Sequence, residues 1–445
     1  MIKRISAWTL CAGLALGTLT ACSGLKTDNV ADPAKPGEKA SVKGIDEPAT
    51  IFMYSVDATK TETFDLLWGD RLRKKFPKLT VEFLQESKGN TIQDLAARKQ
   101  IPDIIRVGFN TLREDYLDIG LGYDMRPIIE KHKYDLSKFE PSLMTRIVNE
   151  APKGELFGLP ITGSTNSLAM FYNKDIFDKF GLPYPTDNMT WDDVYELTKK
   201  IGRTEGGGVY KGFTGLTPNI LRYNQLGLPF IDPNANKIYD TEKWKAVFNN
   251  FLRFYELPNN PFGENLTDHY NDFSKKLNVA MHLSNHGDYR SFPDKMNWDI
   301  MAIPAMKGIA PNSGGVGAAY WAITQQAPDK ELAFQVISYL LSEEVQIANA
   351  RLGYIPSVVD QKIFDSFGLD DPKLQGKNRK AFFAHPYAPA PAKRDPSLIR
   401  FNESDQANIF RDVLVNVAQN KTDINTALRE ATELIDKKFK EAAAK

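Results

Sequence analysis

The chain has 445 residues, of which 42% are hydrophobic and 25% are charged, as in an ordinary globular protein. This composition excludes collagenous, low-complexity and wholly disordered proteins. Lysine plus arginine and aspartate plus glutamate both number 56, so no cationic surplus is present to neutralise a phosphate backbone, and nucleic acid is not expected as a partner. The length accommodates two lobes or one large domain.

The first 21 residues have the pattern of a secretory signal peptide. Lys3 and Arg4 precede a short apolar run and then small residues. The run ends in Leu19-Thr20-Ala21-Cys22, which resembles the bacterial lipobox, where the cysteine thiol receives a diacylglycerol and becomes the new N-terminus. We therefore expect residues 1–21 to be removed and Cys22 to be lipidated, which would anchor the protein outside the cytoplasm of a bacterium. The alternative is an uncleaved signal anchor.

The segment after Cys22 is predicted to be a flexible linker. Residues 22–48 consist mostly of Lys, Asp, Pro, Gly, Ala and Ser, and they cannot bury enough apolar surface to fold. A linker of this length reaches about 25–30 Å on average. The two cysteines, Cys11 and Cys22, both lie before it, so the folded body has neither a disulfide nor a thiol nucleophile.

The folded body begins with alternating strands and helices. Strands are predicted at 50–55, 79–83 and 102–108, with helices at 64–76 and 92–99 between them. This order implies parallel strands with right-handed crossovers, so the fold class is α/β. Ligands of such sheets bind outside the carboxyl ends of the strands. The rule selects Asp57 after the first strand, residues 86–89 after the second, and Phe109 and Asn110 after the third.

Motifs for catalysis are not found. The phosphate-binding glycine loops, His-Glu-x-x-His and Gly-x-Ser-x-Gly are all missing from the sequence. His282 and His286 are four residues apart at a predicted strand end, where that spacing does not align them for a metal. Asp192-Asp193 and Glu343-Glu344 are explained as acids in the first turn of a helix. No enzyme is expected, although a glycosidase pair of carboxylates from distant strands stays open.

One loop could hold a structural calcium ion; no other cofactor or metal is expected. It places oxygen side chains at positions 1, 3, 5 and 9 of a calcium-type loop: Asp232, Asn234, Asn236 and Asp240. Position 6, however, is Lys237 where glycine is usual. The alternative is a polar turn rich in Asn and Asp.

Several short motifs follow one another along the mature chain. The first group is Gly154-Glu155-Leu156-Phe157-Gly158-Leu159-Pro160, Phe171-Tyr172-Asn173-Lys174-Asp175-Ile176-Phe177, Gly181-Leu182 and Thr190-Trp191-Asp192-Asp193. Later stretches are Val279-Ala280-Met281, Gly314-Gly315, Trp321-Ala322-Ile323 and Gly353-Tyr354-Ile355-Pro356-Ser357. This succession resembles the extracytoplasmic solute-binding proteins that feed sugars to ABC importers, the class that includes maltose-binding protein.

The resemblance implies a two-lobe, type II periplasmic-binding-protein fold that closes like a clamshell about a hinge. The first lobe would comprise 49–163 plus 284–326, and the second 164–283 plus 327–445. The small, polar residues Thr162 to Asn166 suit the first hinge crossing, and similar proteins cross again near 282–287 and 325–328. A plain loop is the alternative at 162–166.

The same resemblance nominates the ligand-binding residues. A sugar needs aromatic platforms edged with polar groups. Asp57, Asn110 and Asn166 correspond by position to acidic contacts in the family, and the region of Tyr223 to its ligand aromatics. The candidates are Asp57, Phe109, Asn110, Asn166, Asn219, Arg222, Tyr223, His286, Tyr289, Gly315, Trp321, Tyr354 and Tyr387. Turn formation or capping is the alternative for the polar residues, and core packing for the aromatic ones.

The expected function is that of a monomeric, lipid-anchored receptor that binds a sugar or oligosaccharide between two lobes and delivers it to the permease of an ABC importer. The alternatives are a secreted carbohydrate-active enzyme and a receptor for a non-sugar solute. An acidic saccharide is weakly indicated by three arginines, Arg222, Arg290 and Arg394. Arginine is more often a solvent-exposed surface residue.

Overall fold

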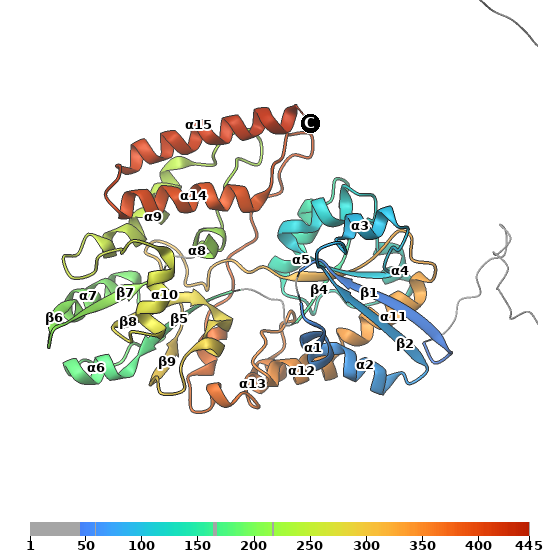
Figure 1. Cartoon of the computed structure of the whole chain (residues 1–445), viewed down its shortest axis with the longest axis horizontal. Helices are drawn as coiled ribbons and strands as arrows, with labels where there is room; N and C mark the ends of the chain where they lie inside the picture. Colours follow the sequence, from blue (N-terminus) through green and yellow to red (C-terminus); the bar gives the residue numbers. More distant parts are fainter. Residues whose placement is uncertain (1–44, 58, 163–166, 216–217, 445) are drawn as a thin grey trace, which may run out of the picture. The chain divides into compact units, whose positions relative to one another are not determined.

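The strands of the described residues form two separate five-stranded sheets (Figure 1). The computed structural model describes residues 45–57, 59–162, 167–215 and 218–444. The first sheet has the order β2-β1-β3-β10-β4, with β1 (Ala49–Ser55), β2 (Leu79–Gln85), β3 (Ile104–Gly108), β4 (Leu159–Pro160) and β10 (Ala319–Ile323). The second has the order β6-β7-β8-β5-β9, with β5 (Leu168–Asn173), β6 (Arg203–Glu205), β7 (Gly208–Thr214), β8 (Val279–Asn285) and β9 (Trp298–Met301).

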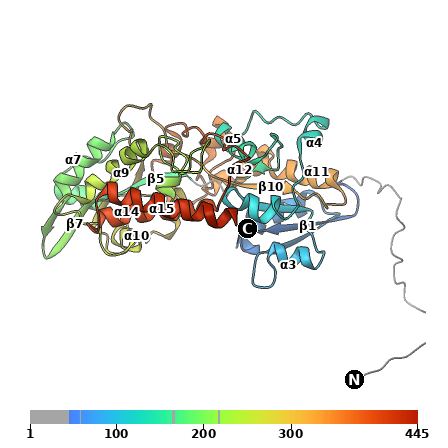
Figure 2. The same ribbon diagram turned by 90° about the horizontal axis from the view of Figure 1, so that it is seen from above.

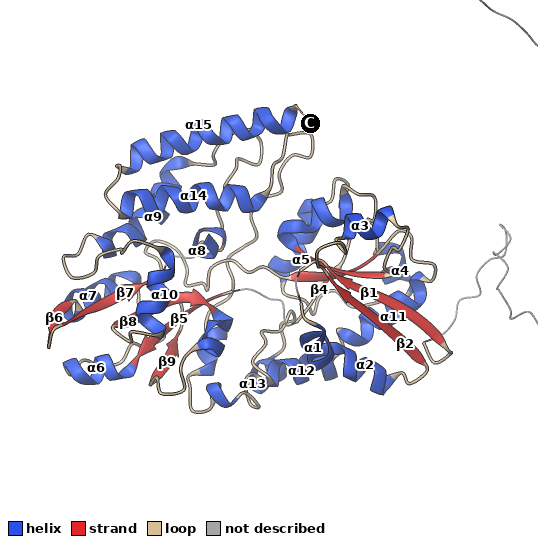
Figure 3. Ribbon diagram, in the orientation of Figure 1, coloured by secondary structure: helices blue, strands red, loops and turns tan. Residues whose placement is uncertain are grey.

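Helices lie around both sheets (Figure 3). Those that follow strands of the first sheet are α1 (Thr61–Phe64), α2 (Asp70–Lys75), α3 (Ile92–Ala97), α4 (Arg126–Lys131), α5 (Pro141–Glu150), α11 (Lys330–Leu340), α12 (Glu343–Arg351) and α13 (Gln361–Ser366). The others are α6 (Lys174–Phe180), α7 (Trp191–Ile201), α8 (Pro218–Arg222), α9 (Thr241–Tyr255), α10 (Leu266–Ser274), α14 (Glu403–Ala418) and α15 (Ile424–Ala443). Short tight or wide helical turns are η1 (Asp65–Gly69), η2 (Phe109–Thr111), η3 (Arg113–Leu117), η4 (His286–Ser291), η5 (Pro372–Leu374) and η6 (Arg379–Phe383).

The parallel pairing expected from the first part of the sequence is confirmed. β1 pairs in parallel with both β2 and β3, with Met53 opposite Phe83 on one side and Ile104 on the other. The crossover helices α2 and α3 lie within the predicted ranges. β10 then adds antiparallel to β3, so the first sheet is mixed. The two-lobe α/β fold is therefore present.

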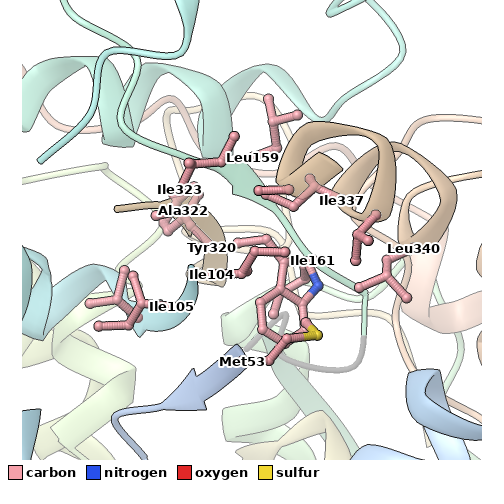
Figure 4. Packing of buried hydrophobic residues seen from close by; sticks show 14 of the residues in the cluster. Met53, Ile104, Ile105, Leu159, Ile161, Tyr320, Ala322, Ile323, Ile337 and Leu340 are labelled. Atoms are coloured by element: carbon pink, nitrogen blue, oxygen red, sulfur yellow. The ribbon is translucent and has the colours of Figure 1, made fainter. Parts of the chain in front are cut away.

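Each sheet has its own hydrophobic core. The first core contains the buried apolar residues of β1 and β3, and Figure 4 shows Ile337 and Leu340 of α11 packed among its residues. In the second sheet, β5 alternates, because Met170 and Tyr172 belong to one cluster and Phe171 to another. Successive side chains of a strand point to opposite faces. The second sheet is therefore covered by apolar residues on both faces.

The chain divides between the lobes differently from the expected ranges. β9, expected in the first lobe as part of 284–326, pairs with β5 in the second sheet. Helices α11 and α12, expected in the second lobe as part of 327–445, contribute Phe334 and Val345 to the first core. The crossings near 282–287 and 325–328 are therefore corrected to one between β9 and β10 and another after α13. The sequence pattern of a strand or helix shows which of its faces is buried. Long-range pairing decides to which sheet that element belongs.

The C-terminal helices complete the second lobe. α14 and α15 lie alongside each other (Figures 1 and 2). α14 also contacts α8 and α9, and the ring of Phe410 on α14 packs at a tilt against Phe230, with ring centres 4.8 Å apart. The segment before α14 lies next to the loop that follows α8, where Arg394 donates to the Ala235 carbonyl at 2.9 Å.

The predictions for the N-terminal segment are not tested by the structure. The signal peptide 1–21, the lipidation site Cys22 and residues 22–44 of the linker lie outside the described residues. Within the described ranges, no helix combines the length and the apolar character needed to cross a bilayer.

Candidate ligand-binding site

A cavity of about 240 Å³ lies beyond the carboxyl end of β3. Phe109 and Asn110 of η2 line it on one side, together with Arg146 of α5. Arg222, the last residue of α8, and Glu403, the first residue of α14, line it on the other side (α5, α8 and α14 in Figure 1). This position follows the general rule that ligands bind outside the carboxyl ends of strands.

Residues of both lobes contribute to this cavity. Phe109 packs against the first core, whereas Phe230 and Ile231 belong to the second. A solute in the cavity would therefore contact both lobes at once.

Arg222 is held in place by the protein itself. Its Nε donates to a Glu403 carboxylate oxygen at 3.0 Å, and its Nη1 donates to Asn219 Oδ1 at 2.8 Å. Asn219 in turn donates from Nδ2 to Asn285 Oδ1 at 2.8 Å. Asn219 therefore positions Arg222, and the hint that this arginine binds an acidic saccharide loses its main support.

Most charged groups of the cavity are paired with one another. The ion pairs are Arg222–Glu403 at 3.0 Å, Arg400–Glu150 at 3.0 Å and Arg113–Asp118 at 3.5 Å. Burial raises the pKa of Glu150 above its ordinary value, although Arg400 opposes the shift. Burial also raises the pKa of Glu114, which accepts a hydrogen bond from Asn402 Nδ2 at 2.7 Å.

Arg146 also has no ion pair within the described part of the chain, and it was not among the residues predicted from the sequence. Arg146 is 5% exposed. Its guanidinium lies 5.0 Å from the centre of the Phe109 ring and 5.9 Å from the centre of the Tyr223 ring. Within the described ranges, no hydrogen bond or ion pair of this side chain is found, and its Nε is buried without an acceptor. A signal was available, because Arg146 occupies an apolar position of α5 between the buried Leu143 and Ile147.

Tyr223 is buried, and a glycine segment crosses it. The Gly315 N–H donates to the Tyr223 carbonyl at 2.8 Å. Gly314 has a φ of +76°, and a Cβ there would overlap the Tyr223 carbonyl oxygen. A Cβ at Gly317 would likewise overlap the Tyr223 hydroxyl. Gly315, a candidate ligand residue, therefore supports the ring that faces Arg146.

Asp57 does not line this cavity. It forms an ion pair with the buried Arg106, and Ser55 Oγ donates to its Oδ1 at 2.7 Å. Burial alone would raise the pKa of Asp57, but Arg106 and the hydroxyl donors outweigh it and hold the pKa below the ordinary value. The carboxylate is half exposed at the carboxyl end of β1, so it is charged and accessible.

A second group of candidates surrounds Arg290. The Arg290 guanidinium donates to the Gly353 carbonyl at 2.7 Å and lies 4.3 Å from the Tyr354 ring centre. Tyr289 is 0% exposed and donates to Asp371 at 2.7 Å. His286 is buried as well, and burial lowers its pKa to about 3. In this group Tyr354 and Arg290 are partly exposed, whereas His286 and Tyr289 are buried.

Two further candidates, Trp321 and Tyr387, lie in or near the core. Trp321 is 0% exposed and meets Trp68 edge to face at 5.4 Å, which confirms the core alternative for it. Tyr387 packs against the small cluster formed by Leu143, Val316 and Ala318. Asn166 and residues 163–165 of the predicted hinge lie outside the described residues.

The loop predicted to bind calcium is occupied by an arginine side chain. Arg394 donates to the Ala235 carbonyl at 2.9 Å, and also to the Asp232 carbonyl and to Asn236 Oδ1. Asp240 accepts the Lys243 N–H at the start of α9. Among the described residues, no group of three or more His, Cys, Asp or Glu side chains is placed to hold a metal ion. Calcium binding stays an untested prediction.

The arrangement is suited to binding a polar solute. Paired charges, side-chain amides and aromatic faces converge on a cavity between two cores, as in binding sites for small polar molecules. Phe109, Asn110 and Arg222 are the sequence-predicted residues that the structure brings together there.

Comparison with known proteins agrees with this architecture. The profile of the family described as bacterial extracellular solute-binding protein matches residues 57–347, which is more than half of the chain. The chain is 24% identical, over 251 residues, to the sn-glycerol-3-phosphate-binding periplasmic protein of Brucella melitensis biotype 1. That match covers 52% of this chain and 55% of the relative, so the chain spans about half the length of the curated relatives it matches.

Two solved structures share the fold across most of their length. The sugar-binding protein MalE of Xanthomonas citri superimposes with a TM-score of 0.68 at 19% identity, covering 88% of this chain and 98% of that one. UgpB of Mycobacterium tuberculosis in complex with glycerophosphocholine superimposes with a TM-score of 0.65 at 15% identity, again covering 88% and 98%. With its two-lobe fold and the profile match together, the chain belongs to the bacterial extracellular solute-binding proteins.

Proposed function

We propose that this chain is the substrate-binding receptor of an ABC importer and that it takes up a small, hydroxyl-rich solute of the sugar or polyol type. The observation that carries this proposal is the cavity beyond β3, which is lined by residues of both cores. Relatives named for a sugar and for glycerol-phosphate compounds support the same solute class.

Binding between the lobes provides a mechanism for signalling to the permease. A solute that contacts both lobes stabilises the conformation in which they are close, and it shifts the population by its difference in affinity for the two states. The permease would then recognise the closed form and receive the solute unaltered.

Lipid anchoring forms part of the proposal. Leu19-Thr20-Ala21-Cys22 resembles a lipobox, and a lipidated Cys22 followed by a polar linker would hold a monomeric receptor at the outer face of a bacterial membrane. Growing the cells with an alkyne-labelled fatty acid tests this. The label should attach to the wild type and not to Cys22→Ala, and label on both proteins would contradict lipidation at this residue.

A thermal-shift screen tests the binding function. The mature protein, purified as its host processes it, is heated with neutral sugars, sugar acids, polyols and their phosphate esters. A solute that binds only the folded state at 100 times its Kd stabilises it by about 2.7 kcal/mol, which is a clear rise in Tm. If no member of the panel raises the Tm, the proposed solute class is wrong.

The solute recovered after incubation tests the enzymatic alternative. A receptor returns the best-binding solute unchanged after hours with protein at micromolar concentration. Chromatography that detects a cleaved or modified product would identify the chain as a carbohydrate-active enzyme instead.

A further inference from the structure

The cavity contains a buried arginine that forms no ion pair with any carboxylate of the described residues. Arg146 is 5% exposed, lines the cavity, and has an Nε without an acceptor. Its neighbours within cation–π distance are the rings of Phe109 and Tyr223. Burying a charge without a partner is costly, and a guanidinium does not avoid the cost by losing its proton.

The carboxylates nearby already have other partners. Glu150 lies four residues after Arg146 on α5, and its carboxylate is bound to Arg400 at 3.0 Å. Glu403 is bound to Arg222 at 3.0 Å. No ion pair within 4 Å joins Arg146 to any carboxylate of the described residues. The charge is therefore available to a group that enters the cavity.

The other groups of the cavity suit hydroxyls. Glu114 has one amide donor, from Asn402, and a carboxylate can accept further hydrogen bonds. Asn110 and Asn149 add side-chain amides to the lining. The cavity has a volume of about 240 Å³, which gives room for a small polar solute.

We propose that Arg146 binds an anionic group of the solute, either the carboxylate of a sugar acid or the phosphate of a sugar or polyol monoester. The Phe109 ring would pack against the apolar face of the same molecule. This inference rests on the proposed function and narrows it, from hydroxyl-rich solutes in general to those that carry a negative charge.

Matched pairs of solutes test the inference in calorimetric titrations of the mature protein. The pairs are galactose and galacturonate, glucose and glucose 6-phosphate, and glycerol and glycerol 3-phosphate. We expect the acidic member of at least one pair to bind more than about 30-fold tighter than its neutral partner, since a charged hydrogen-bonded pair adds substantially to affinity. The pair that shows the difference distinguishes the carboxylate from the phosphate.

The variant Arg146→Met should remove that difference and leave the two members of the pair within about threefold of each other. Arg146→Lys keeps the charge but not the planar fork, and it should retain part of the preference. If the wild type binds neutral sugars as tightly as acidic ones, the inference is overturned while the receptor function stands. If neither class binds, the proposed function itself fails.

Stability without solute separates a ligand-binding arginine from a structural one. Arg146→Met removes a buried charge that has no ion pair among the described residues of the solute-free protein, so the Tm of the solute-free protein should stay the same or rise. The matched control, Arg400→Met, breaks the ion pair with Glu150 and should lower the Tm. A fall in Tm for Arg146→Met as large as that for Arg400→Met would show that Arg146 is structural and would overturn the proposal.

Discussion

Two buried arginines lie near the same edge of the first sheet, and they differ in how their charge is compensated. Arg106 on β3 is 6% exposed and forms an ion pair with Asp57, beside Ser55 Oγ at 3.3 Å. Arg146 on α5 is 5% exposed, forms no ion pair among the described residues and lies within cation–π distance of two aromatic rings. Equal burial therefore does not mean equal roles. A charge satisfied within the fold stabilises it, whereas an unsatisfied one that lines a cavity is available to a solute.

The change Asp57→Ala would break this comparison most strongly, because it would leave Arg106 buried without its carboxylate. We expect a loss of about 3 kcal/mol in the free energy of unfolding, measured by urea denaturation at pH 7. Since the pKa of Asp57 is lowered in the folded state, the stabilisation is present at neutral pH and is lost as the pH falls from about 3.8 through the folded value.

Asp57→Asn is the control for this change, because it keeps a hydrogen-bond acceptor beside Arg106. It should cost less than the alanine variant. Equal stability of Asp57→Ala and the wild type would show that Arg106 does not depend on Asp57, and the contrast with Arg146 would fail.

The change Gly314→Ala would test how firmly Tyr223 is held against Arg146. The new methyl group would overlap the Tyr223 carbonyl at a backbone φ of +76°, so we expect a loss of about 2–3 kcal/mol by thermal or urea unfolding. Gly308→Ala is the matched control, because Gly308 has a φ of +86° with open space around it, and backbone strain alone costs about 1 kcal/mol. Equal losses would mean that the contact with Tyr223 contributes nothing.

A buried histidine differs from the buried arginines, because it can lose its proton and become neutral whereas arginine stays charged. His282 is buried, with Nδ1 2.9 Å from Thr214 Oγ1, and burial lowers its pKa from 6.5 to about 3. The folded state therefore favours neutral histidine, and stability falls as the pH drops from about 6.5 towards 3. At pH 5 the loss from this one residue is about 2 kcal/mol.

Urea denaturation at pH 7.5 and pH 5 measures this effect. His282→Asn should show a smaller fall between the two pH values than the wild type does. An identical pH dependence in the two proteins would show that His282 is not the responsible group.

The smallest change in stability is expected for an arginine whose ion pair is exposed to solvent. Arg429 binds Glu433 at 2.8 Å on the surface of α15, one turn along the helix, and both side chains are exposed. Arg429→Ala should change the free energy of unfolding by less than about 0.5 kcal/mol and leave solute binding unchanged. A larger loss would mean that the degree of burial does not separate the roles of the arginines.

Part of the candidate site could be predicted from the sequence. The rule that ligands bind at the carboxyl ends of strands led to Phe109 and Asn110, and the structure places both on the cavity. The family resemblance nominated Trp321 and Tyr289, which lie fully inside the cores, because an aromatic residue is equally suited to packing and to stacking on a sugar. Arg146 was missed because a single charged residue on an apolar helix face has no motif.

The sequence by itself determined the α/β class, the parallel pairing at the start of the first sheet and the membership of a solute-binding family. These features follow from local periodicity and from short motifs, which do not depend on distant parts of the chain. Only the tertiary structure decided that β9 belongs to the second sheet and α11 to the first core, and which arginine is left without a partner. Those outcomes depend on which residues, far apart in the sequence, bury one another's surface and compensate one another's charge, and a local pattern carries no information about that.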